Sequence, residues 1–547
     1  MGAPRTTAAL LLAALLAGAA TAQPALPDAA AQQALERQQR ERQREDERLQ
    51  RQPARPPVAA PAEPAAPAPT GGPLVPVQRI ETGPSAILGA AQLRAAVAPY
   101  EGRSLPLATL QQVVQAINAL YAAAGAPTAR ALLPPQDVTD GVVRITLVEA
   151  RLGQVRLGPT RLAADVVLPQ LQLAEGTLLS VPQIEDALQR FNRVNAVQLA
   201  ATLAAGNRTG TTDVLLQPAD PPARQWTLWT DNAGAPSLGR ARLGLALRIP
   251  LLSAAGDSLS ASLLATGAAP SPSLSLAWQR PLGPDWLLEA SATAGRISVQ
   301  RGPFAALDVL SRSGEVGLAL TRRLWLAPAG QWTAGLRLAG RSAATEVGGV
   351  RQQHQQLRLL SLRSDLDWSD ATGSWTADLA LVQGLREAGG DQRYRLLRAN
   401  AARLQPLGGG QQLLLRAALQ WTDAASLPGS EDFQLGGAAS VRGHDEGALA
   451  GRRGALLAAE WRRPLPVPVV CPPPCRLQGA VFAEGGRTST ATGAHTLAGA
   501  GLGLAGDMAT PLGTAGARLA LAWPLRAMPG QADRGSARLH ATASLQW

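Results

Sequence analysis

The chain has 547 residues, a formal net charge of +11 and a hydrophobic fraction of 46%, with a mean hydropathy of zero. A chain of this length is too long for one compact domain, and its hydropathy gives no sign of helical membrane spans. All 51 basic residues are arginine, and they are dispersed without aromatic-basic clusters. We therefore expect no nucleic-acid partner.

The N-terminus has the pattern of a secretory signal peptide. Arg5 precedes an apolar run over residues 8–20, which ends at Ala20-Thr21-Ala22. The run is too short for a membrane helix, which needs roughly 18 apolar residues, and we expect cleavage after Ala22. An exported chain without membrane helices can still cross a membrane as a closed barrel, whose alternating strands have a soluble-looking average hydropathy.

Residues 29–52 consist of strong helix formers with many charges. Leu35 and Leu49 are the only large apolar residues there, so this helix has no face for a hydrophobic core. The pattern predicts either a solvated helix or a helix inside a polar cavity. Residues 53–73, rich in proline and alanine, predict an extended linker.

Two segments, 75–150 and 151–222, share one order of elements, which indicates an internal repeat of roughly 75 residues. Each predicts a strand, two helices and two further strands. The predicted elements are strands 75–80, 129–133, 141–148, 152–157, 197–203 and 211–216, and helices 90–98, 107–124, 163–171 and 181–193.

From Gln225 to Trp547 the chain alternates apolar and polar residues in segments of about ten, which is typical of a membrane β-barrel. We count sixteen segments, an even number, as a barrel with both termini in the periplasm requires. They start near residues 226, 239, 257, 271, 285, 313, 331, 354, 374, 393, 411, 454, 476, 496, 514 and 535. The alternative is a soluble β-sandwich, but sandwich cores use larger side chains than these alanine and leucine faces.

The longest gap between segments, residues 424–453, falls on the extracellular side after the eleventh strand. It contains Val441-Arg442-Gly443-His444, preceded by Phe433-x-Leu435-Gly436-Gly437. An arginine between valine and glycine in a glycine-rich segment indicates a loop that folds back on the barrel, and this loop is the candidate working part.

The two cysteines form the sequence Cys471-Pro-Pro-Pro-Cys475 in a periplasmic turn. This spacing matches neither a CxxC motif nor a four-ligand zinc site. In an exported protein it favours a small-loop disulfide, and a redox or metal role remains the weaker alternative.

Taken together, these residues resemble the TpsB transporters of two-partner secretion, the ShlB/FhaC/HecB family of the outer-membrane assembly factor superfamily. Val441-Arg442-Gly443 matches the family's loop-6 motif, with His444 in place of the usual tyrosine or phenylalanine. Phe482-x-Glu484-x-Gly486 matches its Phe-x-Asp-x-Gly strand motif, with glutamate for aspartate. Residues 231–240 resemble the first barrel hairpin.

The resemblance implies a membrane β-barrel of sixteen antiparallel strands, preceded by two α/β POTRA modules and an N-terminal helix. The implied domains are a signal peptide (1–22), a charged plug helix (23–52), a linker (53–74), POTRA 1 (75–150), POTRA 2 (151–224) and the barrel (225–547) with loop 6 at 424–453.

It also implies an outer-membrane pore whose POTRA modules, in the periplasm, recognise an unfolded partner polypeptide. The pore would translocate this haemolysin- or adhesin-type client, which is β-helical when folded, to the cell surface. The implied protein is a monomer in outer-membrane lipid with no catalytic residues, metal or cofactor.

Two sets of site residues follow from the resemblance. We expect Arg442 to pair with Glu484 on the inner wall of strand thirteen; the alternative is an arginine exposed in a mobile loop. The second module would contact the client, the alternative being that the modules are spacers. The candidate client-binding residues are Val181, Ile184, Leu188, Phe191 and Arg193.

Three other functions are the alternatives. An outer-membrane protein assembly factor, or insertase, predicts more POTRA modules and no plug helix. A passive porin would not need periplasmic modules. An enzyme in a barrel is disfavoured because no G-x-S-x-G motif occurs and the histidines are scattered, at His354, His444, His495 and His540.

Overall fold

The computed structural model describes ten segments of the chain. These are residues 29–50, 58–59, 74–208, 210–267, 271–299, 305–385, 393–466, 475–490, 493–526 and 536–547. The predicted signal peptide at 1–22 lies outside them, as does Cys471 of the predicted disulfide. Within the described segments, no helix combines the length and the apolar character needed to cross a membrane.

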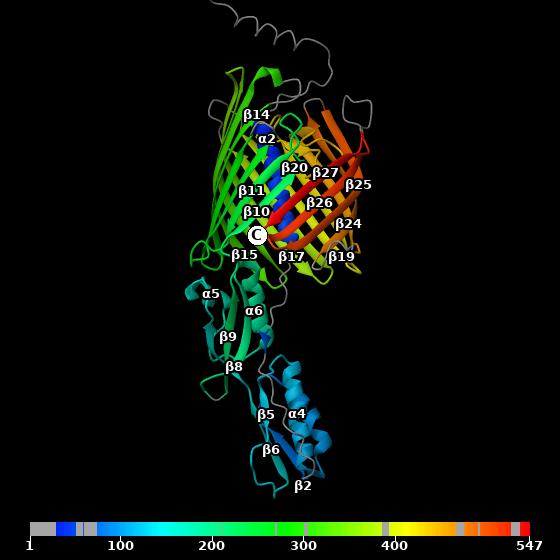
Figure 1. The fold of residues 1–547 in the computed structure, drawn as a ribbon. Coiled ribbons are helices and arrows are strands. Elements are labelled where there is room, and N and C mark those ends of the chain that lie inside the picture. Colours follow the sequence, from blue (N-terminus) through cyan, green and yellow to red (C-terminus); the bar gives the residue numbers. More distant parts are fainter. Residues whose placement is uncertain are drawn as a thin grey trace, which may run out of the picture.

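Sixteen antiparallel strands form a closed barrel, as predicted, in the order β10 to β20 followed by β23 to β27 (Figure 1). Their starting residues differ from the predicted ones by at most four positions. The strands are β10 (Gln225–Asp231), β11 (Arg242–Ile249), β12 (Ser258–Thr266), β13 (Ser273–Leu282), β14 (Trp286–Ser298), β15 (Val309–Ala327), β16 (Gly330–Val347), β17 (Val350–Asp370), β18 (Gly373–Gly384), β19 (Tyr394–Gly408), β20 (Gln411–Thr422), β23 (Arg453–Pro464), β24 (Arg476–Thr490), β25 (Gly493–Thr510), β26 (Gly513–Pro524) and β27 (Arg538–Gln546).

Alternation along the strands separates an apolar outer face from a polar lumen. On β15 and β16, Leu318, Leu336 and Leu338 are 52–56% exposed, whereas Glu315 and Arg341 point into the lumen and pair with each other. Leucine on the outside is stable because lipid is the solvent there. The same alternation that identifies the strands therefore supplies a lumen lined with charges.

The ladder between the first and last strands is the shortest in the barrel. β10 and β27 pair at five positions, from Thr227↔Gln546 to Asp231↔Thr542. Above the end of β10, the side chain of Asn232 continues the ladder, donating to the Leu539 carbonyl (2.7 Å) and accepting from the Ala541 amide (2.9 Å).

Below the barrel lie two α/β modules (Figure 1). The first contains β2 (Leu74–Val77), β3 (Arg79–Thr82), α3 (Ala90–Val97), β4 (Arg103–Pro106), α4 (Leu107–Ala123), β5 (Arg130–Leu132) and β6 (Val142–Val148). The second contains β7 (Arg151–Leu157), α5 (Ala164–Leu171), α6 (Val181–Val194), β8 (Gln198–Ala205) and β9 (Thr211–Ala219). Each has its own buried cluster, around Ile117 in the first and Phe191 in the second.

The predicted linker contributes a short strand that was not predicted. β1 (Val58–Ala59) pairs in parallel with β8, at Val58↔Ala201 and Ala59↔Thr202. It covers the edge strand β8 of the second module's sheet. Two residues in a proline- and alanine-rich segment are too few to show alternation.

Helix α2 (Ala29–Gln50) lies inside the barrel (Figure 1). It contacts β15, β16, β18 and β19 of the wall. Its apolar contacts are few: Leu49 packs against Ala402 and Leu414, and Ala30 against Ala343. Of the two environments that the sequence allowed for this helix, the polar cavity is the one observed.

Candidate functional site in the barrel lumen

The site is the loop between β20 and β23, residues 423–452, which is the sixth on the side away from the modules and is called loop 6 here. It folds into the lumen rather than outward. Leu435 and Val441 of the loop are fully buried against Leu456 of β23 and Leu497 of β25. The loop carries a 3₁₀ turn, η3 (Gly429–Glu431), and a small sheet of β21 (Phe433–Leu435) and β22 (Leu449–Gly451).

The structure brings Arg442 and Glu484 together. Nε and Nη2 of Arg442 both donate to Oε1 of Glu484, at 2.9 and 2.6 Å. The backbone amide of Arg442 donates to the other oxygen, Oε2, at 2.7 Å. Glu484 is 5% exposed, so the pair is largely desolvated. Both carboxylate oxygens are satisfied by one residue of the loop, which fixes its backbone as well as its side chain.

Glu460 of β23 is a second partner that sequence reasoning missed. Its Oε2 accepts from Nη2 of Arg442 at 2.7 Å, and its Oε1 accepts from Arg462 at 2.6 Å. Glu460 lies directly opposite Phe482 on the neighbouring strand. The guanidinium of Arg442 stacks over the Phe482 ring, 3.3 Å from its centroid. Glu460 could have been found from its position opposite the Phe482 motif residue, which puts both on the lumenal face.

Two glycines of the predicted motifs are required by close packing. Gly443 has φ +94°, and a Cβ there would lie 2.9 Å from the Pro524 nitrogen and 3.0 Å from the Trp523 carbonyl carbon of β26. A Cβ on Gly486 would lie 2.6 Å from the Leu435 side chain. Loop 6 therefore packs closely against the wall at both places, against backbone atoms at Gly443 and through the Leu435 side chain at Gly486.

His444 and Asp445 extend the contact around the wall. His444, which is 4% exposed, bonds through Nε2 to the Ala498 carbonyl of β25 at 3.1 Å. Asp445 pairs with Arg538 of β27, whose Nη2 is 2.9 Å from Oδ2, and with Arg240 at 3.0 Å. Arg240 follows β10, so Asp445 bridges the two sides of the shortest ladder.

A second buried carboxylate, Glu431 in η3, was also missed from the sequence. Its side chain is fully buried and forms ion pairs with Arg341 of β16 and Arg398 of β19. Its carbonyl accepts from Gln420 of β20 at 2.7 Å. Arg37 of α2 lies 3.8 Å from the carboxylate. Glu431 thus attaches loop 6 to strands other than those that hold Arg442.

The lower end of α2 is held by charges of both signs. Arg48 donates to Asp367 at 2.7 Å and lies 3.4 Å from Asp365. Arg416 of β20 donates to Glu45 of the helix at 2.7 Å and also pairs with Asp46. The helix is therefore seated on the wall by polar contacts, with little apolar burial to hold it.

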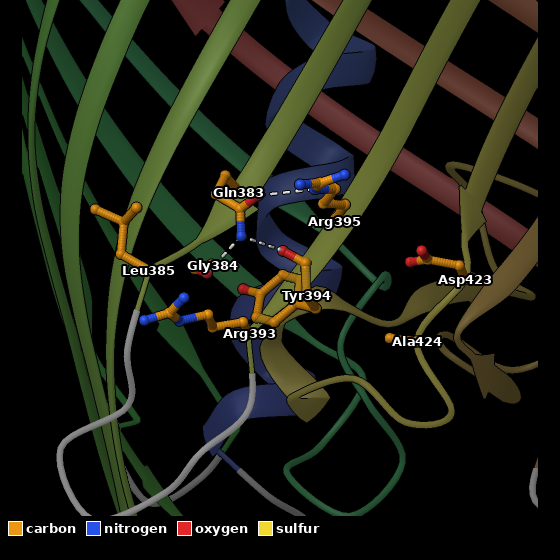
Figure 2. A pocket seen from close by; sticks show the side chains of 8 residues that line it. All are labelled: Gln383, Gly384, Leu385, Arg393, Tyr394, Arg395, Asp423 and Ala424. Atoms are coloured by element: carbon orange, nitrogen blue, oxygen red, sulfur yellow. Dashed lines mark hydrogen bonds between the residues drawn. The ribbon is translucent and has the colours of Figure 1, made fainter.

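A cavity of about 620 Å³ opens at the outer ends of β18 and β19, next to the start of loop 6 (Figure 2). Gln383 links the two strands by donating to the Gly384 and Tyr394 carbonyls, at 2.8 and 3.1 Å. Its lining also includes Arg393, Arg395 and Asp423.

The candidate client-binding residues on α6 require a correction. Ile184, Leu188 and Phe191 are at most 2% exposed and form the core of the second module. These three residues form the inward face of the helix, so they are not a docking surface. Val181 and Arg193 are half-buried, and Arg193 donates to the Pro328 carbonyl in the turn between β15 and β16.

The model of the family described as haemolysin secretion/activation protein ShlB/FhaC/HecB matches residues 210–506. A second model, the ShlB-type POTRA domain, matches residues 75–150. The first match covers the barrel from β10 into β25 and includes all of loop 6, and the second match covers the first module.

Several curated proteins are similar in sequence. The outer membrane transporter CdiB of Dickeya dadantii is 26% identical over 72% of each chain. The heme/hemopexin transporter protein HuxB of Haemophilus influenzae is 22% identical over 67% of this chain and 68% of its own. CdiB of Escherichia coli is 29% identical, but the match spans less than a third of that protein's length.

Solved structures share the fold. CdiB from Escherichia coli matches with a TM-score of 0.66 at 21% identity, over 96% of this chain and all of that one. BamA from Haemophilus ducreyi, lacking POTRA domains 1–3, matches with a TM-score of 0.55 at 14% identity, over 87% of this chain and all of that one.

Proposed function

Because the chain belongs to the ShlB/FhaC/HecB family of haemolysin secretion/activation proteins, we propose that it translocates one unfolded partner polypeptide to the cell surface. Its barrel lies in the outer membrane, and its POTRA modules lie in the periplasm. The observation that carries the proposal is the occupied lumen: α2 and loop 6 fill it and are held by polar contacts that can be exchanged.

The client is first held in the periplasm by the modules. An extended polypeptide can add to an exposed sheet edge through main-chain hydrogen bonds, which make little demand on sequence. At β8 of the second module that edge is taken by β1, at only two positions. A client strand that binds there must displace β1, and the shortness of β1 makes the exchange feasible.

Translocation then requires the lumen to empty. α2 leaves toward the periplasm, and loop 6 shifts while the client passes. No ATP is available in the outer membrane, so the energy comes from progressive folding of the client outside, into a β-helix of the haemolysin or adhesin type. The protein works as a monomer.

Co-expression tests this function. The chain is produced together with a large secreted β-helical protein as candidate client, and the medium is assayed for that protein. We expect the client outside the cell only when both are present. If the client stays in the periplasm while other barrel proteins fail to assemble in the chain's absence, the insertase function is the correct one.

The role of α2 is tested by electrical recording. Deleting residues 23–52 removes the helix and should raise the conductance of the channel in planar bilayers. An unchanged conductance would show that α2 does not close the pore.

A further inference from the structure

The outward face of β17 to β20 changes character near the strand ends that lie away from the modules. An apolar row crosses the four strands and is made by the paired residues Leu362, Leu381, Leu397 and Trp421. Leu362, Leu381 and Trp421 are 48–49% exposed. Such a row is stable because lipid is its solvent, and tryptophan is typical of the membrane interface. The row therefore lies near the outer edge of the apolar band.

Closer to the loops, the outward positions become cationic (Figure 2). Two residues beyond the apolar row, Gln383 of β18 is paired with Arg395 of β19. Beyond this pair, the Leu385 amide donates to the Arg358 carbonyl at 2.9 Å, and Arg393 directly precedes β19. All three arginines are exposed. Since Gln383, Leu385, Arg393 and Arg395 line the cavity of about 620 Å³, this cavity lies at the boundary between the apolar row and the cationic rim.

The guanidinium groups at this cavity are largely unpaired. Within the described segments, the side chains of Arg358 and Arg393 form no hydrogen bond or ion pair, and Arg395 uses only Nε, which donates to Oε1 of Gln383 at 3.3 Å. Asp423, the one carboxylate among the described lining residues, forms no ion pair with them. Arginines of the lumen, by contrast, are matched by carboxylates of the wall and of loop 6. The cavity is therefore able to accept an anion from outside the chain.

The residue types define the kind of anion. The planar guanidinium group binds phosphate through two parallel hydrogen bonds, and it is less strongly hydrated than an ammonium group. A cavity of several hundred Å³ has room for a headgroup and not only for a single ion. The apolar row that begins next to the cavity offers a surface for acyl chains. An acidic polypeptide would satisfy the charges but would leave this row unused.

We propose that this cavity binds the phosphate-bearing headgroup of a lipid of the outer leaflet. Arg393 and Arg395 bind the phosphate, and the acyl chains lie along Leu381 and Trp421. Gln383 is a positioning residue, because it holds Arg395 through Nε and leaves both Nη groups free for the ligand. A lipid held in this way fixes the depth at which this side of the barrel lies in the leaflet.

The first test measures lipid binding to the full-length protein in detergent by native mass spectrometry. The probe is lipid A, an acylated glucosamine disaccharide with two phosphates. Combining Arg393→Ala with Arg395→Ala should weaken its binding at least tenfold, the ratio expected from losing one or more charge-assisted hydrogen bonds. Heat-modifiable gel mobility shows whether each barrel is folded.

Arg487→Ala is the matched control. Arg487 of β24 is also exposed, and it alternates with the inward Glu484 and Gly486, but it lies outside the cavity. Its loss should leave the dissociation constant for lipid A unchanged. An R487A chain that binds as weakly as the double variant would show a general attraction to positive charge, and this would overturn the proposal of a site.

A change of opposite sign separates the proposal from damage to the fold. Asp423→Asn removes a negative charge from the cavity lining, so it should tighten the binding of lipid A several-fold, because like charges repel. Misfolding cannot produce such a gain. Unchanged or weaker binding by D423N would contradict the placement of the phosphate in this cavity.

Three further probes identify the source of the phosphate. Lipid A from which both phosphates have been removed should bind at least tenfold more weakly, and millimolar inorganic phosphate should not displace intact lipid A. Displacement would show a site for free anions. A glutamate-rich peptide that binds better than lipid A would show a polypeptide site, and either result would overturn the lipid assignment. All these measurements are made without a client, so they are independent of the proposed secretion.

Discussion

Loop 6 and α2 both occupy the lumen, but they are held by contacts of different kinds. The loop is anchored through carboxylates of at most 5% exposure, Glu484 and Glu431, and it has an apolar core around Leu435. The helix pairs with wall and helix carboxylates that are up to a third exposed, such as Asp365 and Asp46, and buries few apolar side chains.

The difference has an energetic meaning. Breaking a buried ion pair by removing one partner costs about 3–5 kcal/mol, because the other charge stays unpaired. A solvent-exposed pair contributes only about 0.2–1 kcal/mol and is weakened by salt. The loop is thus attached firmly at defined points. The helix combines one well-buried pair, Glu45 with Arg416, with pairs to more exposed carboxylates such as Asp365, which contribute less.

The largest effect should come from Gly443→Ala, which breaks the loop's attachment without touching a charge. A methyl group there would clash with the backbone of β26, at a residue whose positive φ already disfavours alanine. Secretion of the client should be abolished in a barrel that still folds. Gly493→Ala is the control, because Gly493 also has a positive φ but nothing lies near its Cβ position. Secretion by G443A equal to that of G493A would show that the close contact is not needed.

Arg442→Ala should come next. It leaves Glu484 buried without its main donor, at a cost of about 3–5 kcal/mol to the resting position of the loop. We expect a folded barrel that secretes at least tenfold less client. Glu460→Gln removes only one of the contacts of Arg442 and should have a smaller effect. Wild-type secretion by R442A would refute the role assigned to the pair.

The open fraction of the channel, which reports on α2, should respond to the loss of an ion pair of the helix and to salt. Arg48→Ala should raise the open fraction of single channels several-fold, since Arg48 meets carboxylates on β17 and β18. Arg44, which is exposed, provides the control variant R44A. Raising the KCl concentration should increase the wild-type open fraction. It should also reduce the difference in open fraction between the wild type and R48A. A salt-independent open fraction would mean that charge does not hold the helix.

The smallest effect concerns the first module. Partial burial raises the pKa of Glu149, but hydrogen bonds from the Ser85 hydroxyl, the Ala86 and Ile87 amides and Tyr121 outweigh it and leave the pKa lowered. Because the folded pKa lies below the unfolded one, this stabilisation is complete above the unfolded pKa and is lost as pH falls through the folded pKa.

Hydrogen exchange of amides 85–88 in the full-length protein, corrected for the intrinsic pH dependence, measures this effect. In the wild type, exchange should be slow at neutral pH and faster in acid. In Glu149→Gln, exchange should be fast at both pH values. Glu175→Gln, at an exposed position in the second module, should behave as wild type. Equal protection of these amides in E149Q and in the wild type at neutral pH would show that Glu149 does not stabilise this turn.

The barrel could be predicted because alternation is a local signal that repeats sixteen times. β1 and β4 were missed because they have two and four residues, and β4 ends at Pro106. Arg442 and Glu484 could be paired because each lies in a motif. The partners of Glu431 and Asp445 could not be predicted, because they depend on the path of loop 6 across the lumen and not on the spacing of residues in the sequence. Ile184, Leu188 and Phe191 were misassigned because the resemblance pointed to the helix but not to which of its faces is buried.

The pairing of β1 with β8 also sets how far α2 can travel. Eight Cα–Cα steps separate Gln50, the last residue of the helix, from Val58, the first paired residue. At about 3.6 Å per residue the intervening chain reaches about 29 Å at most, while the 22-residue helix is itself about 33 Å long. While β1 stays paired, the end of the helix remains within this radius of the second module. Detachment of two residues from a sheet edge lengthens the tether and gives the helix a wider range in the periplasm.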